Sequence, residues 1–393
     1  MPNARDLQPL DVPSGTGALE VLPALQRALD GAGPALLPVA ADAPGEAQRL
    51  ITALCGPLGP GEDAEQDPTA LVIATSGSTG IPKGVLLPAS ALRASAEATH
   101  RRLGGPGHWL LAMPAHHVAG IQVLVRALLA GTTPHAVDTS GGFRPDVFAA
   151  AARGLPSSGG PRYTALVPTQ LSRLINDGGE GLAALREFDA VLLGGAATPP
   201  ALLARAGECG VRVTTTYGMS ETAGGCVYDG VPLDVAEVDV DGELGPIRLA
   251  GPMLARGYRN QPDAPAFAGG WFRTGDLGRF AEGRLEVLGR ADDVIITGGE
   301  KIAPLPVERV LTEQPGVHEA CVLGVPDPEW GQAVVAAVVA DPAARPDEAA
   351  LREAVRGRLG AASAPKRIAL VDELPLRGPG KPDRRALAEQ LTC

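Results

Sequence analysis

Short apolar segments alternate with amphipathic ones from about residue 69 to residue 215. The apolar segments are typical of buried strands, at 70–74, 109–112, 163–167, 190–193 and 211–215. The intervening stretches predict helices at 90–103 (with Ser90 as N-cap), 121–130, 169–176 and 199–207. A chain that alternates in this way covers both faces of a mainly parallel sheet with helices. The pattern therefore predicts a large layered α/β domain.

The pattern differs on either side of this region. Before it, a helix is expected at 18–29, a strand at 35–39 and a Gly/Pro/acid-rich loop at 56–68. After it, antiparallel strands are expected at 245–249, 277–280 and 284–288. Beyond residue 289 the pattern predicts helices at 306–311 and 348–359 and strands at 319–325 and 333–339. This last part predicts a small, separate α+β domain.

Charge and composition exclude several classes of protein. Apolar residues make up 45% and charged residues 20% of the 393 residues, as in ordinary globular proteins, and the net charge is −11. A negative chain is unsuited to general nucleic-acid binding. No apolar run approaches a membrane span, and the first residues lack a signal-peptide pattern. Five scattered cysteines without CxxC spacing indicate reduced thiols in a cytoplasmic protein, with neither a zinc site nor a disulfide framework.

A loop rich in glycine and hydroxyl groups, Thr75-Ser-Gly-Ser-Thr-Gly-Ile-Pro-Lys-Gly84, follows the strand expected at 70–74. Glycines let backbone N–H groups turn toward an anion, hydroxyls add donors, and Lys83 adds a full positive charge. It is not a Walker loop, because Ile-Pro follows Gly80 and no Ser or Thr follows Lys83. The segment predicts a different kind of phosphate-binding loop, with a solvated turn as the alternative.

Lysine is scarce, at positions 83, 301, 366 and 381 only, in a chain that otherwise uses arginine. A lysine ammonium is a compact point charge that can follow a phosphate or a carboxylate through a reaction. Lys381 follows Gly378-Pro-Gly, which suggests a mobile loop that presents one charge. A plain surface turn is the alternative for Lys381.

Two further segments carry single acids. Tyr217-Gly-Met-Ser-Glu-Thr222 follows the strand expected at 211–215, at the sheet edge where ligands of α/β proteins bind. There Glu221 is a candidate ligand for Mg²⁺ and Tyr217 a candidate base-stacking residue, with a helix cap at Ser220 as the alternative. Asp276 is a candidate acceptor from ribose hydroxyls, with an Asx turn as its alternative.

Two adjacent histidines lie in Met113-Pro-Ala-His-His-Val-Ala-Gly120. Neighbouring side chains on a strand or helix do not face the same side, so we do not expect His116 and His117 to form a metal pair. One of them is expected to shape a pocket, and the other to cap a loop.

Taken together and in this order, the segments resemble those of the adenylate-forming superfamily, which comprises acyl-CoA synthetases, peptide-synthetase adenylation domains and luciferases. The resemblance covers about residues 69–390. It implies a large multi-layer α/β N-terminal domain (1–289), truncated at its N-terminus, and a small mobile α+β C-terminal domain (290–393). Typical members have a longer segment before the phosphate loop.

The resemblance also implies roles for individual residues. ATP would be bound by Thr75, Ser76, Gly77, Ser78, Thr79, Gly80, Lys83, Gly195, Ala196, Thr216, Tyr217, Gly218, Met219, Ser220, Asp276 and Arg290. The catalytic residues would be Lys83, Glu221 and Lys381, with Mg²⁺ held at Glu221 and Thr79. Asp292 would be the hinge between the domains, and CoA would be bound by Gly298, Gly299 and Lys301.

A closer resemblance is to the o-succinylbenzoate–CoA ligases of menaquinone biosynthesis, of the short actinobacterial type. It is carried by Leu166-Val-Pro-Thr-Gln-Leu171, by 113–117 with Gln122-Val-Leu-Val-Arg126, and by the long run 217–232. It implies 2-succinylbenzoate, ATP and CoA as substrates, and homodimers through the large domain. The acid would contact His117, Arg126, Gly194, Gly218, Gly224 and Gly225. Arg126 falls on a basic residue that meets the free carboxylate in some relatives.

The implied reaction has two halves. The acid first attacks the α-phosphorus of ATP and pyrophosphate leaves, and the CoA thiol then attacks the acyl-adenylate after the small domain rotates about Asp292. Two positions depart from the usual pattern: Lys301 stands where several relatives have Arg, and Ser220 where many have Thr. The alternatives are another aryl- or acyl-CoA ligase, an adenylation enzyme that loads a carrier protein, and a non-catalytic nucleotide-binding relative.

Overall fold

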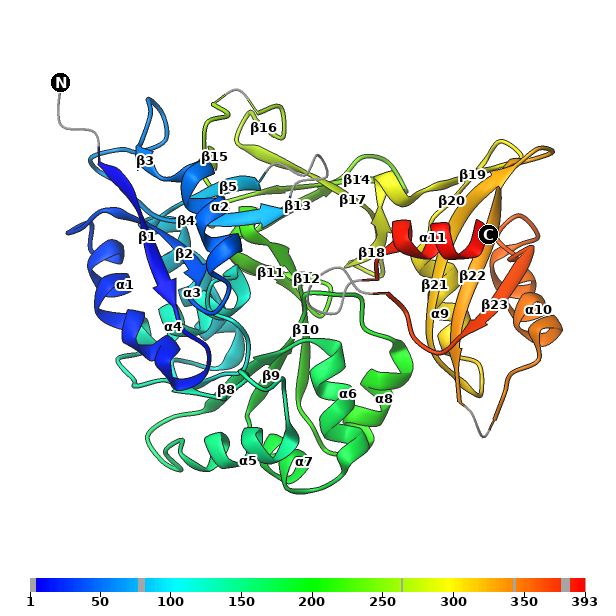
Figure 1. Ribbon diagram of the computed structural model, residues 1–393, viewed down its shortest axis with the longest axis horizontal. Coiled ribbons are helices and arrows are strands. Elements are labelled where there is room, and N and C mark those ends of the chain that lie inside the picture. Colours follow the sequence, from blue (N-terminus) through cyan, green and yellow to red (C-terminus); the bar gives the residue numbers. More distant parts are fainter. Residues whose placement is uncertain (1–4, 77–81, 263, 342–343, 376–381, 393) are drawn as a thin grey trace. The chain divides into compact units, whose positions relative to one another are not determined.

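The structure is a computed structural model that describes residues 5–76, 82–262, 264–341, 344–375 and 382–392 (Figure 1). The chain forms two compact units. Unit 1 comprises Met1–Gly195, Ala206–Asp239 and Arg248–Arg273, and unit 2 comprises Ala196–Arg205, Val240–Ile247 and Thr274–Cys393. No described helix is both long and apolar enough to cross a membrane.

The first sheet of unit 1 has the strand order β15-β5-β4-β2-β1-β3. Its strands are β1 (Asp6–Val12), β2 (Ala35–Ala40), β3 (Gly56–Pro57), β4 (Thr69–Ser76), β5 (Pro82–Pro88) and β15 (Gly257–Tyr258). Strands β1, β2 and β4 run parallel, whereas β5 pairs antiparallel with β4. The β4–β5 hairpin places the two ends of the predicted phosphate loop side by side, with Thr75 opposite Lys83.

The second sheet of unit 1 has the order β12-β11-β10-β9-β8-β6-β7. Its strands are β6 (His108–Leu111), β7 (His135–Ala136), β8 (Arg162–Leu166), β9 (Ala190–Leu193), β10 (Val213–Met219), β11 (Gly224–Tyr228) and β12 (Val231–Pro232). Strands β6 to β10 are parallel along this sheet, and β11 turns back antiparallel to β10. The carboxyl ends of the parallel strands therefore share one edge, where ligands of such sheets bind.

Helices pack between and around these two sheets. They are η1 (Gly15–Val21), α1 (Leu22–Leu29), α2 (Pro44–Leu54), α3 (Ala89–Leu103), α4 (Val118–Ala130), α5 (Pro145–Arg153), α6 (Pro168–Asp177), α7 (Glu180–Leu185) and η2 (Ser220–Thr222). Helix α8 (Pro200–Glu208) begins in a stretch that belongs to unit 2. Helix α3 contacts β4 of the first sheet and β11 of the second, and α4 packs on α1, α3 and β6. One core therefore joins both sheets through these helices.

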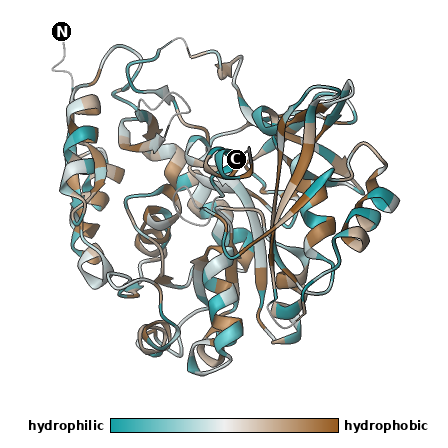
Figure 2. Ribbon diagram, turned by 45° about the vertical axis from the view of Figure 1, so that its right-hand side comes forward, coloured by the Kyte–Doolittle hydropathy of each residue, from teal (hydrophilic) through white to brown (hydrophobic). Residues whose placement is uncertain are grey.

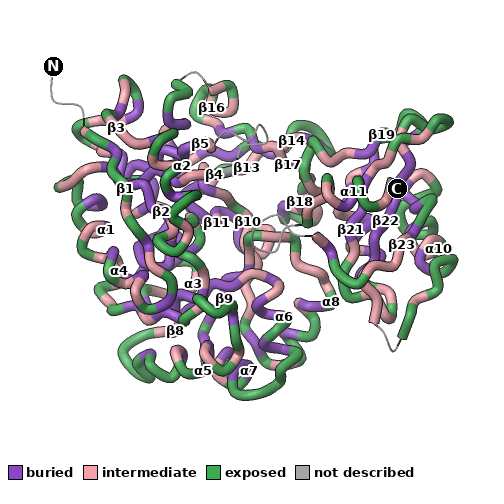
Figure 3. The backbone as a smooth tube through the Cα atoms, viewed as in Figure 1, coloured by how far each residue is buried: buried purple, intermediate pink, exposed green. Residues whose placement is uncertain are grey.

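Alternation along the strands explains this layering. In β4, Leu71 and Ile73 face the core shared with α1, α3 and α4, whereas Val72 faces a second core under α2. Side chains of a strand alternate between faces, so a strand that is apolar on both faces has to be covered on both. Figure 2 shows hydrophobic residues along the strands, and Figure 3 shows buried residues in the same layers.

A third sheet has the order β13-β14-β17-β16, with β18 paired to β17. These strands are β13 (Glu237–Val240), β14 (Gly245–Ala250), β16 (Phe267–Ala268), β17 (Trp271–Ala281) and β18 (Arg284–Arg290). A fourth sheet, in unit 2, has the order β20-β19-β22-β21, with β23 paired to β22. Its strands are β19 (Ile295–Thr297), β20 (Glu300–Ile302), β21 (Val317–Asp327), β22 (Gly331–Ala340) and β23 (Arg367–Val371).

Unit 2 covers both faces of its sheet with helices: η3 (Ala291–Asp293), α9 (Pro304–Thr312), α10 (Glu348–Leu359) and α11 (Arg384–Thr392). Val322 of β21 packs in a core with α9 and α10, whereas its neighbour Cys321 packs with Leu387 of α11 on the other face. Helix α10 begins at Asp347, whose carboxylate accepts hydrogen bonds from Ala349 N and Ala350 N. Together these contacts give the α+β arrangement expected for the last part of the chain.

Most of the expected elements are present, and some boundaries were wrong. Strands at 70–74 and 190–193 and helices at 121–130 and 348–359 are confirmed within a few residues. The predicted N-cap Ser90 was wrong: α3 begins at Ala89 after Pro88, and Ser90 Oγ instead donates to Asp67. The sequence analysis did not identify β1, α2, β5, β11, β23 or α11 as elements. Several of these are short, or are defined by a partner strand that is distant in the sequence.

Candidate functional site

The two ends of the predicted phosphate loop lie on the β4–β5 hairpin of unit 1. Thr75 is near the end of β4 and Lys83 near the start of β5, and Thr75 Oγ1 lies 3.4 Å from Lys83 O, to which it donates. Gly84 follows Lys83 where a Cβ atom would lie only 2.7 Å from Val72 Cγ1, so this position requires glycine. The predicted loop residues Gly77, Ser78, Thr79 and Gly80 lie outside the described residues.

Tyr258 brings the phosphate-loop lysine and the predicted metal carboxylate together. Its hydroxyl donates to Glu221 Oε1 at 2.7 Å, and the Lys83 ammonium lies 5.2 Å from the centroid of its ring. Tyr258 is 6% exposed and is held by strand pairing, because β15 pairs with β5 and places Tyr258 opposite Val85. A cation and a carboxylate thus meet at one aromatic side chain within unit 1.

The sequence analysis did not identify Tyr258 as a site residue. Tyrosine occurs only four times in the chain, as rarely as lysine, and this scarcity was a usable signal. The backbone of the same segment ties the two parts of the site together. Ala255 N donates to Glu221 O at 2.8 Å, and Arg259 N donates to Gly84 O at 2.7 Å.

The segment that carries Glu221 differs from the predicted loop. Strand β10 extends to Met219, so the expected end of the strand at residue 215 was wrong, and Thr216, Tyr217 and Gly218 are strand residues. The extension arises because β11 pairs back on β10, with a bulge between Tyr217 and Gly218. Ser220, Glu221 and Thr222 then form the short helix η2, in which Glu221 is half-buried. The Glu221 side chain therefore projects from a tight turn between two paired strands.

A conformationally restricted residue ends this turn. Ala223 has φ +49°, a left-handed conformation that is uncommon for residues other than glycine. Its carbonyl accepts hydrogen bonds from Gln122 Nε2 at 2.7 Å and Ser95 Oγ at 2.9 Å, from helices α4 and α3. These two bonds fix the backbone between Glu221 and Gly224.

Arg126 of α4 is a buried cation that lies beside Gly224. Its side chain is buried, with the guanidinium 5.1 Å from the ring centroid of Trp109, and no described carboxylate lies within ion-pair distance. Its Nε atom is buried and has no hydrogen-bond partner among the described residues, and burial lowers the pKa of the guanidinium. Burial, helped by the charge of Arg126, also lowers the pKa of His100 to about 4. The cluster therefore carries the positive charge of Arg126, and no described carboxylate pairs with it.

Gly224 lies beside both Gln122 and Arg126. Gly224 has φ +100°, and a Cβ atom there would lie 3.5 Å from Gln122 Cγ and 4.0 Å from an Arg126 Nη atom. The neighbouring Gly225 packs against Tyr228 and Thr216, 3.0 Å and 3.1 Å from where its Cβ would lie. Of the two predicted substrate-binding glycines, Gly224 thus borders the buried arginine.

Three other predicted residues lie at the carboxyl end of β9. Gly194 packs against Thr216 so closely that a Cβ atom would lie 2.4 Å from Thr216 Oγ1, and Gly195 has φ +83°. Ala196 continues this loop after β9. Gly194 and Gly195 follow β9 directly, and Thr216 lies on the adjacent strand β10, at the ligand-binding edge of the second sheet.

The two histidines have different environments. His116 is half-buried and lines a cavity of about 190 Å³, with Ser14, Asp42, Met113 and Thr139 among the other lining residues. Burial lowers the pKa of His116, against an opposing effect of Asp42. His117 is exposed and lies at the N-cap position of α4. His116, and not His117, is thus the histidine that lines a cavity. The predicted contact of His117 with the substrate stays a prediction.

In unit 2, Asp276 and Arg290 face each other on β17 and β18. Arg290 Nη1 lies 3.3 Å from Asp276 Oδ1, and its other Nη atom lies 3.9 Å from Asp292 Oδ2. Asp276 is 9% exposed, whereas Asp292 of η3 is exposed. The predicted ribose acid, nucleotide-contacting arginine and hinge acid therefore form one chain of charges.

The predicted CoA loop is the turn of the β19–β20 hairpin. Gly298 and Gly299 have φ +59° and +85°, and Lys301 is exposed on β20. A Cβ atom on Gly298 would lie 2.8 Å from the ring of Trp330, whose carbonyl accepts from Gly298 N at 3.0 Å. The turn thus exposes backbone and one lysine beside an indole ring. The predicted catalytic Lys381 lies outside the described residues.

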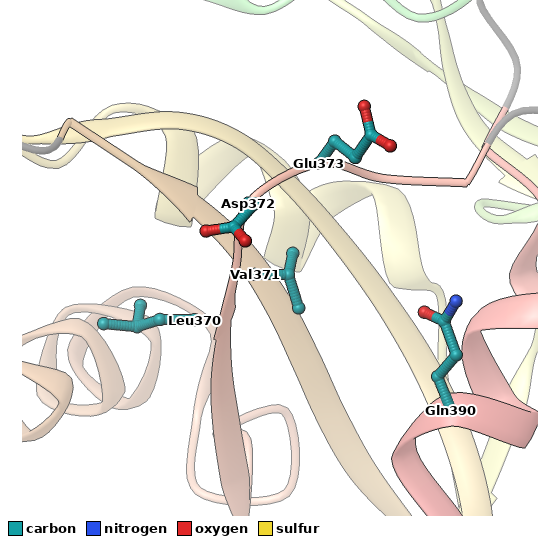
Figure 4. Close-up of a pocket in the computed structure, with 5 residues that line it drawn as sticks. All are labelled: Leu370, Val371, Asp372, Glu373 and Gln390. Atoms are coloured by element: carbon teal, nitrogen blue, oxygen red, sulfur yellow. The ribbon is translucent and has the colours of Figure 1, made fainter.

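An open hollow in unit 2 lies between the end of β23 and α11 (Figure 4). It is lined by Leu370, Val371, Asp372, Glu373 and Gln390. Its two charged side chains are both carboxylates, which repel an anionic ligand. This hollow is therefore unsuited to a phosphate or a carboxylic acid, in contrast to the cluster around Arg126.

Comparison with known proteins agrees with this arrangement. Residues 21–259 match the AMP-binding enzymes, and residues 306–381 match the AMP-binding enzyme C-terminal domain. A probable 2-succinylbenzoate–CoA ligase of Mycobacterium tuberculosis is 46% identical over 389 residues, 98% of each chain. A sulfoacetate–CoA ligase of Cupriavidus necator is 37% identical over 82% of this chain and 67% of that protein.

The fold is shared with solved structures. The o-succinylbenzoate CoA synthetase from Bacillus subtilis, in complex with its acyl-adenylate intermediate, superposes with a TM-score of 0.74 at 25% identity, over 100% of this chain and 89% of that one. The sequence matches cover both the large and the small parts of such enzymes. The chain therefore belongs to the family of adenylate-forming, AMP-binding enzymes.

Proposed function

We propose that this enzyme ligates 2-succinylbenzoate to CoA in menaquinone biosynthesis, through an acyl-adenylate, and releases AMP and pyrophosphate. The observation that carries the choice of acid is Arg126, a buried guanidinium beside Gly224 without a described carboxylate partner. The relatives named as 2-succinylbenzoate–CoA ligases support the same choice. 2-Succinylbenzoate has two carboxylates, and the one that does not react can pair with this cation.

The energetics favour a ligand anion at Arg126. Burying a charge in a low-dielectric interior without a partner destabilises the protein by several kcal/mol, because no ion pair offsets the loss of hydration. The Trp109 ring compensates a part of this, about 2 kcal/mol for a desolvated cation–π pair. A carboxylate with bidentate geometry would supply the rest and would be selected over a neutral group.

In the first half-reaction the acid carboxylate attacks the α-phosphorus of ATP, and positioning and charge neutralisation supply most of the catalysis. Lys83 and the loop from Thr75 to Lys83 would hold the departing pyrophosphate. Asp276 and Tyr217 would fix the nucleoside, and Lys381 would bridge the acid and the α-phosphate. Tyr258 supports this scheme because it positions Glu221 beside Lys83.

The surroundings of Glu221 fit Mg²⁺. Oε1 accepts from Tyr258, and the half-buried carboxylate retains acceptor capacity for a cation. No cluster of three or more metal-ligating side chains occurs in the described part of the chain. This agrees with Mg²⁺, which proteins usually bind through one or two carboxylates together with substrate phosphates. Glu221, with Thr79, would hold the ion, and the ion would neutralise phosphate charge.

For the second half-reaction we propose that residues 290–393 form a small domain that rotates on the large domain 1–289 about Asp292. The exposed Gly298–Gly299 turn and Lys301 would then bind the pantetheine arm of CoA. Such motions are taken up at a few residues between domains. We also propose a cytoplasmic location and pairing of two copies through the large domain.

Pyrophosphate release across a panel of acids, with and without CoA, tests the function. We expect turnover with 2-succinylbenzoate and little with benzoate. Replacing Arg126 with Met should raise the KM for the diacid at least about tenfold, the loss of one charge-assisted pair, with an unchanged KM for ATP. An unchanged KM of this variant for the diacid would refute the role of Arg126. If no acid led to pyrophosphate release by the wild type, the proposed ligase activity would be refuted.

A second candidate acid follows from the sulfoacetate–CoA ligase similarity. Sulfoacetate also carries a second anionic group, so it would satisfy the same buried arginine. It lacks the aromatic ring of 2-succinylbenzoate. Including sulfoacetate in the panel separates the two: greater kcat/KM for sulfoacetate than for 2-succinylbenzoate would replace the first proposal with the second.

A further inference from the structure

Within the described part of the chain, four buried polar side chains around Arg126 have an atom without a hydrogen-bond partner. They are His100 Nε2, Trp109 Nε1, Gln122 Oε1 and Arg126 Nε. The Arg126 guanidinium lies 5.1 Å from the ring centroid of Trp109, and the His100 and Trp109 rings are 6.3 Å apart. Buried polar atoms are nearly always paired, so such a concentration calls for a functional reason. The proposed reaction assigns no role to two members of this group, His100 and Gln122, and of these Gln122 lies on the same helix as Arg126.

The amide of Gln122 has a defined orientation. Its Nε2 donates to the carbonyl of Ala223 at 2.7 Å and to Leu92 O at 3.5 Å. A carbonyl accepts only from the NH₂ end, so these contacts assign the nitrogen and leave Oε1 as the unbonded atom. Gln122 is fully buried. Its side chain is therefore anchored at one end and has an unpaired acceptor at the other.

Gln122 and Arg126 are four residues apart on α4 and so are neighbours on one face of that helix. Both also border Gly224: a Cβ there would lie 3.5 Å from Gln122 Cγ and 4.0 Å from an Arg126 Nη atom. A glutamate at position 122 would have nearly the same shape and would place a carboxylate within reach of the guanidinium. The glutamine that is present has nearly the shape of a glutamate but carries no negative charge.

We propose that Gln122 is a specificity-determining residue that keeps the charge of Arg126 available to the substrate. This inference rests on the proposed function, because it needs an acid with a second anionic group. An internal carboxylate at this position would form a buried ion pair with Arg126, and the pocket would then present a neutral pair to the ligand. The neutral amide of Gln122 forms no ion pair with Arg126. The negative charge that pairs with Arg126 must then come from the second anionic group of the acid.

The test compares Gln122→Glu with Gln122→Met, a matched control that loses the same Ala223 hydrogen bond but adds no charge. Pyrophosphate release is measured with 2-succinylbenzoate and with 4-oxo-4-phenylbutanoate, which has one carboxylate. The readout is the ratio of kcat/KM for the diacid to that for the monoacid. We expect Gln122→Glu to lower this ratio at least about tenfold, mainly through the KM of the diacid, and Gln122→Met to keep it within about threefold of wild type.

Equal ratios in the two variants would overturn the inference and leave Gln122 with a packing role only. A fall in the ratio for Gln122→Met would overturn it as well, because the charge would then not be the cause. If the Gln122→Glu chain does not fold, Gln122→Asp places the same charge on a smaller side chain. It should lower the ratio in the same direction, and an unchanged ratio would refute the proposal.

The wild-type and Arg126→Met enzymes separate this inference from the proposed function. A wild-type preference for the diacid that is lost in Arg126→Met supports the function, whatever the Gln122 variants do. If the wild-type enzyme shows no preference for an acid with a second anionic group, both proposals fall. A preference that depends on Arg126 but is equal in the Gln122 variants removes only the role of Gln122.

Discussion

The hydroxyl of Tyr258 donates to Glu221 Oε1 at 2.7 Å. These residues are 37 positions apart in the sequence and meet because β15 pairs with β5, beside the turn that carries Glu221. The same tyrosine ring lies under the Lys83 ammonium. One side chain thus sets the relative positions of the carboxylate proposed to hold Mg²⁺ and the lysine proposed to hold pyrophosphate.

Replacing Tyr258 with Phe should weaken the response to Mg²⁺. A hydrogen bond to a charged group contributes about 1.5–3 kcal/mol, so we expect a rise of about tenfold or more in the Mg²⁺ concentration that gives half-maximal pyrophosphate release. Tyr163→Phe is the matched control, because Tyr163 donates to the carbonyls of Leu103 and Gly105 instead. An equal Mg²⁺ response in both variants would contradict the role of Tyr258.

Replacing Lys83 with Met should slow adenylate formation. The loss of one preorganised charged donor to a leaving group costs about 10²–10³ in kcat, by analogy with oxyanion-site donors. Single-turnover pyrophosphate release without CoA measures this step. Lys366→Met is the control, since Lys366 also lies over an aromatic ring, 4.1 Å from the centroid of Trp330, but belongs to unit 2. A normal rate in Lys83→Met would remove Lys83 from the mechanism.

Glu62→Ala should destabilise the large unit. Glu62 forms a buried ion pair with Arg259, with side chains 5% and 7% exposed, and also accepts from Gly59 N at 2.7 Å. Removing one partner leaves a buried charge unpaired and costs about 3–5 kcal/mol. Urea unfolding measures the change. Asp234→Asn, which disrupts the exposed Arg101–Asp234 pair, should cost at most about 1 kcal/mol. Similar losses for the two variants would argue against the buried pair.

His100 should make stability depend on pH below neutrality. Its pKa is lowered to about 4 by burial and by Arg126, whereas unfolding restores an ordinary value of about 6.5. Between these values the unfolded chain binds more protons, so the free energy of unfolding falls as the pH is lowered from about 6.5 to about 4. Above about pH 6.5 the stability that depends on neutral His100 is fully present. It amounts to at most about 3 kcal/mol.

The measurement is urea unfolding of the wild type and of His100→Gln across this pH range. The two curves should converge as the pH falls, because the variant lacks the titrating group. His318→Gln removes an exposed histidine and should follow the wild-type curve. Parallel wild-type and His100→Gln curves would show that His100 does not titrate in this way.

Much of the fold was predictable because its signals are local. The strand at β9 and the helix α10 were placed at their observed bounds, since apolar runs and amphipathic spacing are set by residues within one element. The end of β10 was not, because its last residues are strand only through pairing with β11, which begins at Gly224. Edge strands such as β15 depend entirely on a partner distant in the sequence.

The residues alone predicted the layered α/β class, a candidate phosphate-binding loop with Lys83, and the candidate site residues Glu221 and Asp276, whereas Arg126 was predicted from the family resemblance. The tertiary structure decided which of these charges meet and which remain unpaired. Tyr258 reaches Glu221 through strand pairing, and folding buries Arg126 against Trp109 and Gly224, where no described carboxylate pairs with it. Burial and long-range pairing are properties of the packed chain, and they make Arg126 a buried cation that we propose as the anion site.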